Sequence, residues 1–394
     1  SMSVMMVPLE DAFGWRRDVI SLAAAVGIFT YGLVGPFAAA LMDRIGLRRT
    51  LLGALLIMSG STALSLVMSE PWHLVATWGI MSGVGSGAVA TVLGATVVNR
   101  WFKTNRGLMM GLMSASAATG LLIFLPLLAS LAQHGGWKPV AIAVSIATAA
   151  LIPLVLLLVP ERPSSIGLTR YGAEGPEPEA PATSGNFLVH TLATLRDAAR
   201  QRVFWYLFAT FFICGFTTNG LVGTHLIAFC SDMGIPEVQA AGLLAMMGVF
   251  DLIGTTASGW LTDRFDPRKL LAVYYGIRGA SLFFLPYSGF SAVSLTIFAV
   301  FYGLDWIATV PPTLRLSNEA FGDRSGPLVF GWIVAGHQVG AAAAAFFGGA
   351  MRELQGDYVL AFTIAGMTGI MAAAISLLID PAKPREEAAA PQPA

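Results

Sequence analysis

The stretch AALMDRIGLRR, residues 39–49, decides the fold because it returns in altered form as GWLTDRFDPRK at residues 259–269. The matching Asp-Arg pairs begin at Asp43 and Asp263, which are 220 positions apart. The segments FGWRRD and MGIPEV each start 30 residues before these two aspartates. The chain is therefore built from two related halves.

Composition places both halves in a lipid bilayer. Of the 394 residues, 55% are hydrophobic and only 12% are charged, which is more apolar surface than a soluble core can bury. A membrane-spanning helix needs about 20 predominantly apolar residues. Eleven runs meet this requirement: 18–41, 50–69, 73–98, 107–132, 138–159, 203–230, 238–261, 270–288, 291–314, 326–350 and 358–379. They are continuous rather than alternating, so we expect an all-α polytopic membrane protein and not a membrane β-barrel.

The basic residues are distributed very unequally between the two sets of loops. Eighteen of the 23 Lys and Arg residues lie in the loops that carry the repeated motif, in the linker or in the C-terminal tail. The opposite loops hold only Arg16, Arg17, Lys138 and Arg352, and Arg278 lies inside a hydrophobic run. Basic loops stay on the cytoplasmic side during insertion. We therefore expect a membrane protein whose motif loops, linker and C-terminus are cytoplasmic.

Residues 161–202 interrupt the hydrophobic runs with a Pro-, Gly- and Glu-rich segment typical of a flexible linker. This divides the chain into a first bundle at 1–160, the linker, a second bundle at 203–380 and a tail at 381–394. Late in the linker, Leu188, Leu192, Leu195 and Ala199 recur at helical spacing, which predicts an amphipathic helix on the membrane surface rather than plain coil.

The first bundle is shorter than the second at its start. A complete span, 203–230, precedes MGIPEV, whereas only the stub SMSVMMVPL precedes the equivalent FGWRRD. We expect that most of the first helix is missing from this chain and that the complete protein has twelve spans. A native protein of eleven helices is the alternative.

The repeated motif resembles the signature of the major facilitator superfamily. Its matching residues are Asp43, Arg44, Gly46, Arg48 and Arg49 in the first copy and Gly259, Asp263, Arg264, Arg268 and Lys269 in the second. Two positions depart from the signature, since Ala39 and Asp266 stand where Gly is usual. The resemblance implies two six-helix bundles with a gating function for these loops. The alternative is that the charges only set topology.

Two further segments resemble the monocarboxylate porters and their oxalate/formate-type bacterial relatives. They are RWFKTNRGLMMGLMSASAATG at 100–120 and ERPSSIGL at 161–168. This resemblance implies that the protein lies in the inner membrane of a bacterium and that Asp251 is a proton-coupling acid of the eighth helix. The anion-binding Arg expected four positions later is Thr255 in this chain.

Four ionisable residues lie in successive hydrophobic runs of the second half, namely Asp251, Arg278, Asp305 and His337. Such groups are expensive in hydrocarbon unless they are paired or hydrated, so they are candidates for substrate binding or proton coupling. For Arg278 the alternatives are contact with a substrate carboxylate and a structural ion pair with Asp305 or Asp251. His337 is either a group that titrates during transport or a core histidine. Asn219 and His225 are weaker candidates for the same cavity, with packing hydrogen bonds as the alternative.

The fourth run carries Gly79, Gly83 and Gly87 at every fourth residue, which predicts a face where another helix backbone approaches closely. The chain shows no Walker-type loop, no assembled catalytic constellation and no metal or cofactor motif. The formal net charge of zero gives no reason to expect nucleic acid, and Cys214 and Cys230 share one run, so no disulfide is implied.

These features predict a secondary transporter that works by alternating access and as a monomer. The favoured cycle is symport of a small organic anion with a proton. The alternatives are carboxylate/carboxylate antiport, export of drugs or other small solutes, and a non-transporting membrane sensor.

Overall fold

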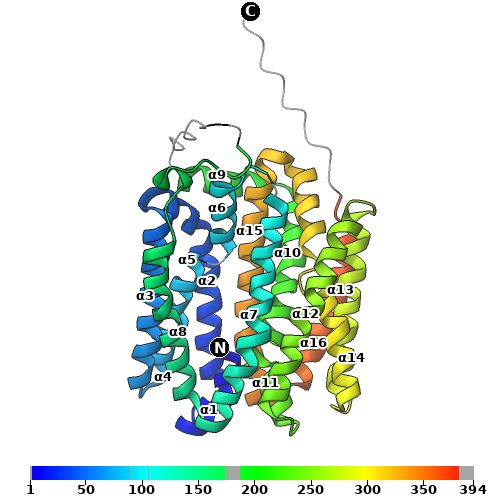
Figure 1. The fold of residues 1–394 in the computed structure, drawn as a ribbon. Coiled ribbons are helices and arrows are strands. Elements are labelled where there is room, and N and C mark those ends of the chain that lie inside the picture. The colour runs from blue at the N-terminus through cyan, green and yellow to red at the C-terminus, as the bar shows by residue number, and fades with distance from the viewer. Residues whose placement is uncertain (1, 90, 105, 174, 176–186, 381–394) are drawn as a thin grey trace, which may run out of the picture.

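The computed structural model is a bundle of long helices that describes residues 2–89, 91–104, 106–173, 175 and 187–380 (Figure 1). The first half begins with α1 (Met2–Phe13), α2 (Arg17–Ile45) and α3 (Leu47–Leu64), which continues into the short 3-10 turn η1 (Ser65–Val67). The next span consists of α4 (Pro71–Leu74), η2 (Val75–Met81), α5 (Ser82–Val89) and α6 (Thr91–Trp101). The half ends with α7 (Arg106–Gly135) and α8 (Trp137–Leu158), after which comes the 3-10 turn η3 (Pro163–Ile166).

The second half repeats this order after α9 (Phe187–Ala198) in the linker. Its first span consists of α10 (Arg202–Gly215), η4 (Phe216–Val222) and α11 (Gly223–Asp232). Then follow α12 (Glu237–Thr262), α13 (Pro267–Phe284) with η5 (Leu285–Tyr287), α14 (Ala292–Asp305), α15 (Val310–Gln355) and α16 (Val359–Leu377). Gly322 has non-helical backbone angles, so it divides α15 between two spans.

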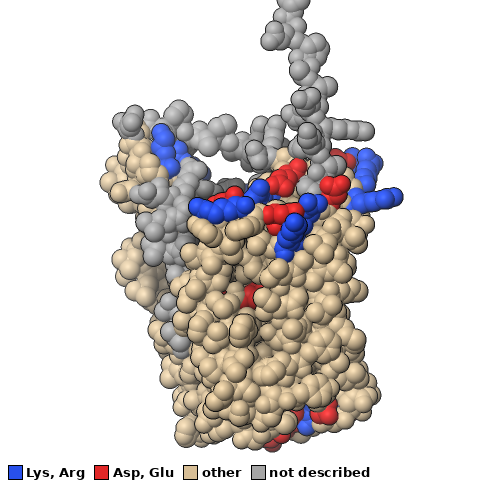
Figure 2. Space-filling view, turned by 90° about the vertical axis from the view of Figure 1, so that its right-hand side faces the viewer, with Lys and Arg blue, Asp and Glu red and all other residues tan. Residues whose placement is uncertain are grey.

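Helices lie over all eleven predicted hydrophobic runs. Within the part of the chain that the structure describes, eight helical segments are long and apolar enough to cross a membrane. Figure 2 shows charged side chains gathered at the two ends of the bundle, with a broad and almost uncharged belt between them. We call the end that carries the motif loops the basic end and the other the opposite end.

The internal repeat is visible in the backbone as well as in the sequence. Gly14 and Gly234, 220 positions apart, both adopt positive φ angles, 65° and 79°, immediately before α2 and α12. Glycine adopts this conformation without the steric cost that a side chain would bring. The same turn therefore precedes the second span of each half.

The glycine face predicted on the fourth span packs against α2. A Cβ added at Gly79 would lie 3.2 Å from the carbonyl oxygen of Ala23, and one at Gly83 would lie 2.8 Å from that of Gly27. Gly87 approaches Tyr31 in the same way. The prediction is confirmed, because these contacts bring the two backbones together along two turns of helix.

Three spans depart from regular α-helix. The segments η2 and η4 are π-helical and seven residues long each. Between α14 and α15, residues 306–309 form turns rather than helix. Irregular backbone is rare inside a membrane because its freed polar groups need partners, and it is frequent at functional sites.

The helix predicted in the linker is present as α9, which lies across the basic end of the bundle (Figure 1). Leu195 and Ala199 pack against the buried cluster around Phe204, while Val189 and Leu192 are exposed. The side chain of Leu188 lies outside the described residues. The helix is therefore amphipathic, with its apolar side partly on the protein.

Within the described residues, most of the contact between the two halves is made by three helix pairs. The contacts join α2 to α15, α7 to α12 and α1 to α11. Within each half the helices pack on one another, for example α3 on α8 and α13 on α16.

Candidate functional site

Arg278 of α13 is fully buried and makes an ion pair with Asp305 at the end of α14. Its Nε donates to Oδ2 of Asp305 at 2.6 Å. One terminal nitrogen donates to the backbone carbonyls of Asp305 and Trp306, at 2.6 and 3.2 Å. The other donates to Sγ of Cys214 at 2.8 Å. This geometry favours the structural pair over direct substrate contact, because every nitrogen of the guanidinium is used inside the second half.

Cys214 links this pair to His337. Its thiol lies 3.4 Å from the hydroxyl of Thr309 and also interacts with the His337 side chain. His337 packs on the ring of Phe211, and its Nδ1 is buried without a hydrogen-bond partner among the described residues. The predicted residues Arg278, Asp305 and His337 are thus brought together around one buried cysteine.

Asp251 of α12 lies beside the same group but holds different partners. Its side chain is mostly buried, with 9% of the residue exposed. Oδ1 accepts from the backbone N–H of Ile307 at 2.8 Å and from the hydroxyl of Thr255 at 3.0 Å. Thr255 thus takes part as a hydroxyl donor at the position where the porters carry an Arg.

The two remaining candidates of the second half lie in different surroundings. His225 is fully buried near the opposite end, where Nε2 lies 2.7 Å from the carbonyl oxygen of Ala345 and Nδ1 lies 3.3 Å from the hydroxyl of Tyr358. Asn219 lies on the π-helical segment η4 and is exposed. His225 therefore does not share a site with Asp251, whereas Asn219 offers a polar group at mid-span.

The first copy of the motif surrounds the turn between α2 and α3. Gly46 has a φ of 102° and leaves the start of α3 without a side-chain cap of its own. Glu161, which follows α8, accepts instead from the backbone N–H groups of Leu47 and Arg48 at 2.7 and 3.0 Å. The Arg48 side chain donates to the carbonyl of Leu156. Arg44 and Arg49 are exposed, and the side chain of Asp43 lies outside the described residues.

The second copy of the motif caps the helix that follows it with one of its own residues. This explains why Asp266 stands where the signature has Gly. Asp266 has a φ of −61° and caps α13 itself, accepting from the backbone N–H of Arg268 at 2.9 Å. The Arg268 side chain also donates to this carboxylate, which holds the pKa of Asp266 below its usual range. Arg264 lies over the ring of Trp260, 4.1 Å from its centroid. Near them, Gly259 and Asp263 form the end of α12, and Lys269 is exposed.

The bonds described for both motif copies stay within their own half. Glu161 and Arg48 join elements of the first half, and Asp266 and Arg268 belong to one helix of the second. The gating function assigned to these loops therefore stays a prediction.

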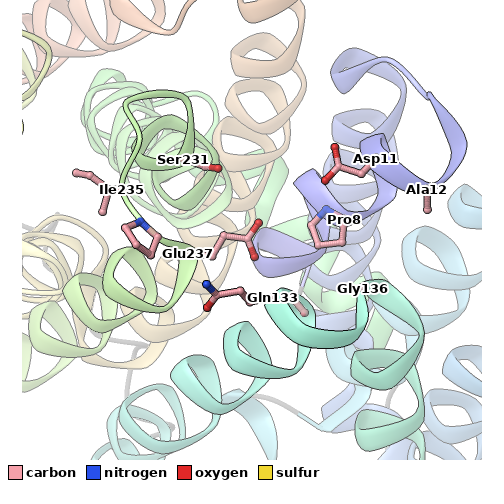
Figure 3. Close-up of a pocket in the computed structure, with 10 residues that line it drawn as sticks. Pro8, Asp11, Ala12, Gln133, Gly136, Ser231, Ile235 and Glu237 are labelled. Atoms are coloured by element: carbon pink, nitrogen blue, oxygen red, sulfur yellow. The ribbon is translucent and has the colours of Figure 1, made fainter.

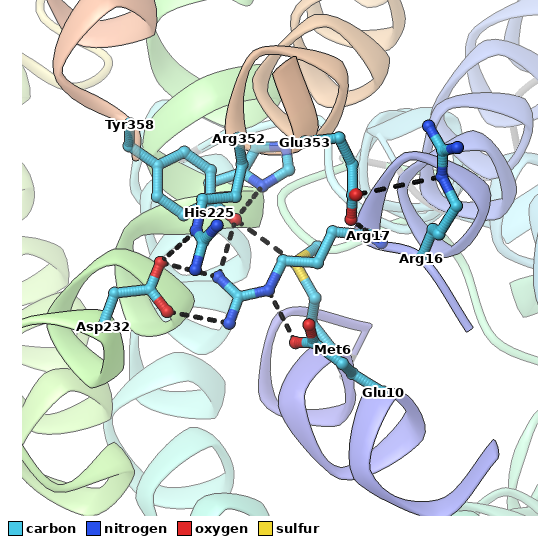
Figure 4. Close-up of polar contacts among 9 residues, drawn as sticks. All are labelled: Met6, Glu10, Arg16, Arg17, His225, Asp232, Arg352, Glu353 and Tyr358. Atoms are coloured by element: carbon cyan, nitrogen blue, oxygen red, sulfur yellow. Dashed lines mark hydrogen bonds and ion pairs between the residues drawn. The ribbon is translucent and has the colours of Figure 1, made fainter. Parts of the chain in front are cut away.

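Ion pairs that cross between the halves are found at the opposite end, around Arg17 (Figure 4). Arg17 is the first residue of α2, and its side chain is only 6% exposed. It binds Asp232 at the end of α11 with two parallel hydrogen bonds of 2.8 Å, and Glu10 of α1 at 2.7 Å. Paired bonds of this kind between a guanidinium and a carboxylate are strong and directional.

This group also includes Arg352, Glu353 and Tyr358. We call the six residues together the Arg17 cluster: Glu10, Arg17, Asp232, Arg352, Glu353 and Tyr358. Arg352 donates to Asp232 at 2.7 Å, and Glu353 accepts from the backbone N–H of Arg17 at 2.8 Å. The Tyr358 hydroxyl accepts from Arg17 at 3.4 Å, and burial raises the pKa of Tyr358 to about 12, so this hydroxyl stays neutral. The cluster joins α1 and α2 to α11, α15 and α16.

A cavity of about 490 Å³ lies beside the Arg17 cluster at the same end. Its lining includes Asp11 of α1, Gln133 of α7, and Ser231 and Glu237 of the second half. Figure 3 shows the Glu237 carboxylate pointing toward α1. Glu237 Oε2 is buried and has no hydrogen-bond partner among the described residues. The halves therefore face each other here with two acids.

Sequence reasoning did not find the Arg17 cluster, because Arg16 and Arg17 were read only as loop charges. One signal was present in the sequence. In the repeat that aligns FGWRRD with MGIPEV, Arg17 corresponds to Glu237. This reversal of charge at equivalent helix starts marks a position where the two halves make different contacts.

The fold, the repeated loops and the cluster between the halves define a two-bundle membrane transporter. Residues 1–324 match the sequence profile of the Major Facilitator Superfamily, and the chain belongs to this family. Membership places it among transporters rather than enzymes.

Several relatives match almost the whole chain. The uncharacterized MFS-type transporter YcxA of Bacillus subtilis (strain 168) is 27% identical over 98% of this chain and 92% of its own length. Monocarboxylate transporter 13 of Rattus norvegicus is 28% identical over 93% and 81%, and the oxalate:formate antiporter of Oxalobacter formigenes is 25% identical over 95% and 85%. The crystal structure of a D-xylose-proton symporter matches with a TM-score of 0.72 at 16% identity, over 96% of this chain and 93% of that one. This likeness confirms the fold.

Proposed function

We propose that this transporter moves a small organic anion by alternating access, with proton coupling at Asp251. The observation that carries the proposal is the environment of the Asp251 carboxylate. It is nearly buried in a spanning helix, and its described hydrogen bonds come from two neutral donors, Ile307 and Thr255. Asp305 nearby is held by Arg278. Asp251 is therefore the carboxylate of this group that is free to take up and release a proton during a cycle.

The substrate class follows from the relatives and from the charge balance. Two of the relatives are named for monocarboxylate transport and for oxalate:formate exchange. The guanidinium of Arg278 is already engaged, so the negative charge of the substrate has to be offset in another way. A proton that crosses together with the anion does this. Asn219, exposed on η4, is the polar side chain that we assign to substrate contact.

Alternating access needs contacts between the halves that form and break. The Arg17 cluster supplies such contacts at the opposite end, since an ion pair connects α2 with α11 and a backbone hydrogen bond to Glu353 connects α2 with α15. Ion pairs suit this task because their partners can be hydrated separately once the halves part.

The proposal is tested in proteoliposomes reconstituted with the purified protein. An inward proton gradient should drive uptake of radiolabelled monocarboxylates such as lactate or pyruvate above the level at equal pH. Asp251→Asn should abolish the response to the gradient because the side chain no longer ionises. The matched control is Asp197→Asn on α9, whose side chain is 62% exposed and whose loss should leave uptake unchanged. Uptake that ignores the gradient in the unaltered protein would contradict proton coupling.

Anion exchange is the second candidate, favoured by the likeness to the oxalate:formate antiporter. It predicts uptake that depends on a carboxylate preloaded inside the vesicle and not on the pH difference. Comparing loaded and empty vesicles at equal pH separates the two cycles.

A further inference from the structure

The span made by α14 and the start of α15 is interrupted at mid-membrane. Residues 306–309 form turns, and Pro311 and Pro312 follow in the first turn of α15. Proline has no N–H to donate and disrupts the turn before it, so carbonyl groups of this segment lose their helical partners. In hydrocarbon such groups must be satisfied from inside the protein.

Side chains from neighbouring helices supply the missing donors. Arg278 of α13 donates to the carbonyls of Asp305 and Trp306. Ser258 of α12 donates to the carbonyl of Ala308, two residues further along, at 2.5 Å. Arg278 is thus bonded to the backbone of the interrupted segment as well as to the Asp305 carboxylate.

The donor side of the same segment is held by Asp251. The N–H of Ile307 points to Oδ1 of Asp251 at 2.8 Å. Ile307 directly follows Trp306, whose carbonyl accepts from Arg278. Carbonyl and N–H of this one peptide unit are therefore held by Arg278 and Asp251 from two different helices.

The backbone approach of α12 to α14 fixes the spacing between these two residues. A Cβ added at Gly254 would collide with the carbonyl group of Leu304, one residue before Asp305. Gly254 lies one turn from Asp251 on α12. The distance from Asp251 to the interrupted segment is therefore set by direct packing of the two helices.

We propose that Arg278 is a positioning residue for proton coupling: by holding the Asp305 and Trp306 carbonyls, it presents the Ile307 N–H to the Asp251 carboxylate. This rests on the proposed function, in which Asp251 carries the proton. The N–H donor stabilises the ionised carboxylate, so its alignment decides how readily Asp251 releases its proton. Arg278 acts through the peptide unit and does not contact the transported anion.

Few other charged groups bear on Asp251. Arg278 of α13 and Asp305 of α14 are the charged neighbours among the described residues. Of the other helices packed on α12, α7 has His134 as its described ionisable side chain, near the opposite end. From α11, His225 bonds to Ala345 and Tyr358, and from α15, His337 interacts with Cys214.

The test joins a functional and a structural measurement. The double variant Arg278→Leu with Asp305→Leu removes the buried pair without leaving one charge alone. We expect uptake to persist and its midpoint against pH to move upward by about one unit, since Asp251 loses a well-aligned donor. Hydrogen–deuterium exchange of the peptide that covers residues 303–312 should become faster. The double variant Asp197→Asn on α9 with Arg200→Gln just after it removes an exposed pair and is the control for both measurements.

A second variant guards against loss of folding in the first. Arg278→Lys keeps the charge but lacks the planar fork that reaches two carbonyls and a carboxylate together. This variant should shift the pH midpoint of uptake and speed up exchange at 303–312 in the same directions, but by less. A folded, active variant at Arg278 with an unaltered pH midpoint and unaltered exchange overturns the positioning function.

Failure of the proposed function looks different. Asp251→Asn keeps an oxygen that accepts from Ile307, so it should leave exchange at 303–312 slow while removing the pH dependence of uptake. If uptake by this variant retains the full pH dependence, Asp251 is not the proton site, and the exchange data still decide whether Arg278 holds the segment.

Discussion

Arg17 and Glu237 occupy equivalent places in the two halves, yet the contacts they make are opposite in kind. Each is the first residue of the second span of its half, and each follows a glycine with positive φ by three residues. Arg17 reaches across to Asp232 and is buried in ion pairs. Glu237 faces Asp11 across a cavity. One repeated turn therefore carries an attractive contact between the halves on one side and two acids on the other.

This difference shows how a duplicated fold becomes asymmetric at low cost. The backbone turn is unchanged, and a change of side chain at one position reverses the sign of the contact. The Arg17 side then holds the opposite end together, whereas the Glu237 side leaves space between the halves.

The largest effect is expected from Arg17→Ala, which removes the attractive contact between the halves. Loss of one partner from a nearly buried ion-pair network should cost about 3 kcal/mol and lower the thermal unfolding midpoint in detergent. Labelling of an introduced Ser231→Cys by an impermeant maleimide should also become faster, because the cavity opens. Arg16→Ala is the matched control, since its side chain is 65% exposed and its ion pairs should contribute little. Equal unfolding midpoints and equal labelling rates in the two variants would refute the assignment of Arg17 as the residue that holds the opposite end together.

A smaller effect is expected from Glu237→Lys, which makes the second side resemble the first. The new ammonium can pair with Asp11, so both sides of the opposite end become attractive. We expect a gain of up to about 1 kcal/mol in stability and a slower transport rate, because opening this end has to break an additional pair. Gln239→Lys adds the same charge at an exposed position and serves as control. A transport rate that rises or stays equal would contradict the prediction.

The smallest effect concerns the same repeat at the basic end, where Asp266 and Gly46 are equivalent. Asp266→Ala should cost about 0.5 kcal/mol, because α13 loses its N-terminal cap. The pKa of Asp266 is lowered in the folded protein, so this contribution is present above the unfolded value near 4 and is lost as the pH falls through the folded value. Thermal stability measured from pH 7 down to pH 3 should therefore show the difference from the unaltered protein shrinking. A stability difference between the variant and the unaltered protein that does not depend on pH would contradict this prediction.

The spans and the repeat were predictable because they depend on local composition. Runs of apolar residues set the helix positions, and the spacing of Gly79, Gly83 and Gly87 predicted close packing correctly. The pairing of Arg278 with Asp305 was one of two interpretations, since both residues needed partners in the same hydrocarbon layer.

Contacts that join distant elements were not predictable in the same way. Arg17 and Asp232 are 215 residues apart, and no periodicity in the chain indicates that the start of α2 lies beside the end of α11. The interruption between α14 and α15 was also missed, although Pro311 and Pro312 mark it. For His225 the sequence left a cavity position and a packing hydrogen bond open, because sequence gives depth in the membrane but not the direction in which a side chain points; the structure shows hydrogen bonds to Ala345 and Tyr358.

Glu353 gives the junction between the halves a further property. It accepts the backbone N–H of Arg17, so the first turn of α2 is completed by a carboxylate that belongs to the other half. When the halves separate, that turn is left with an unpaired N–H and is expected to fray. Exchange of the Arg17 amide with solvent would then count opening events directly, without any label or transported solute.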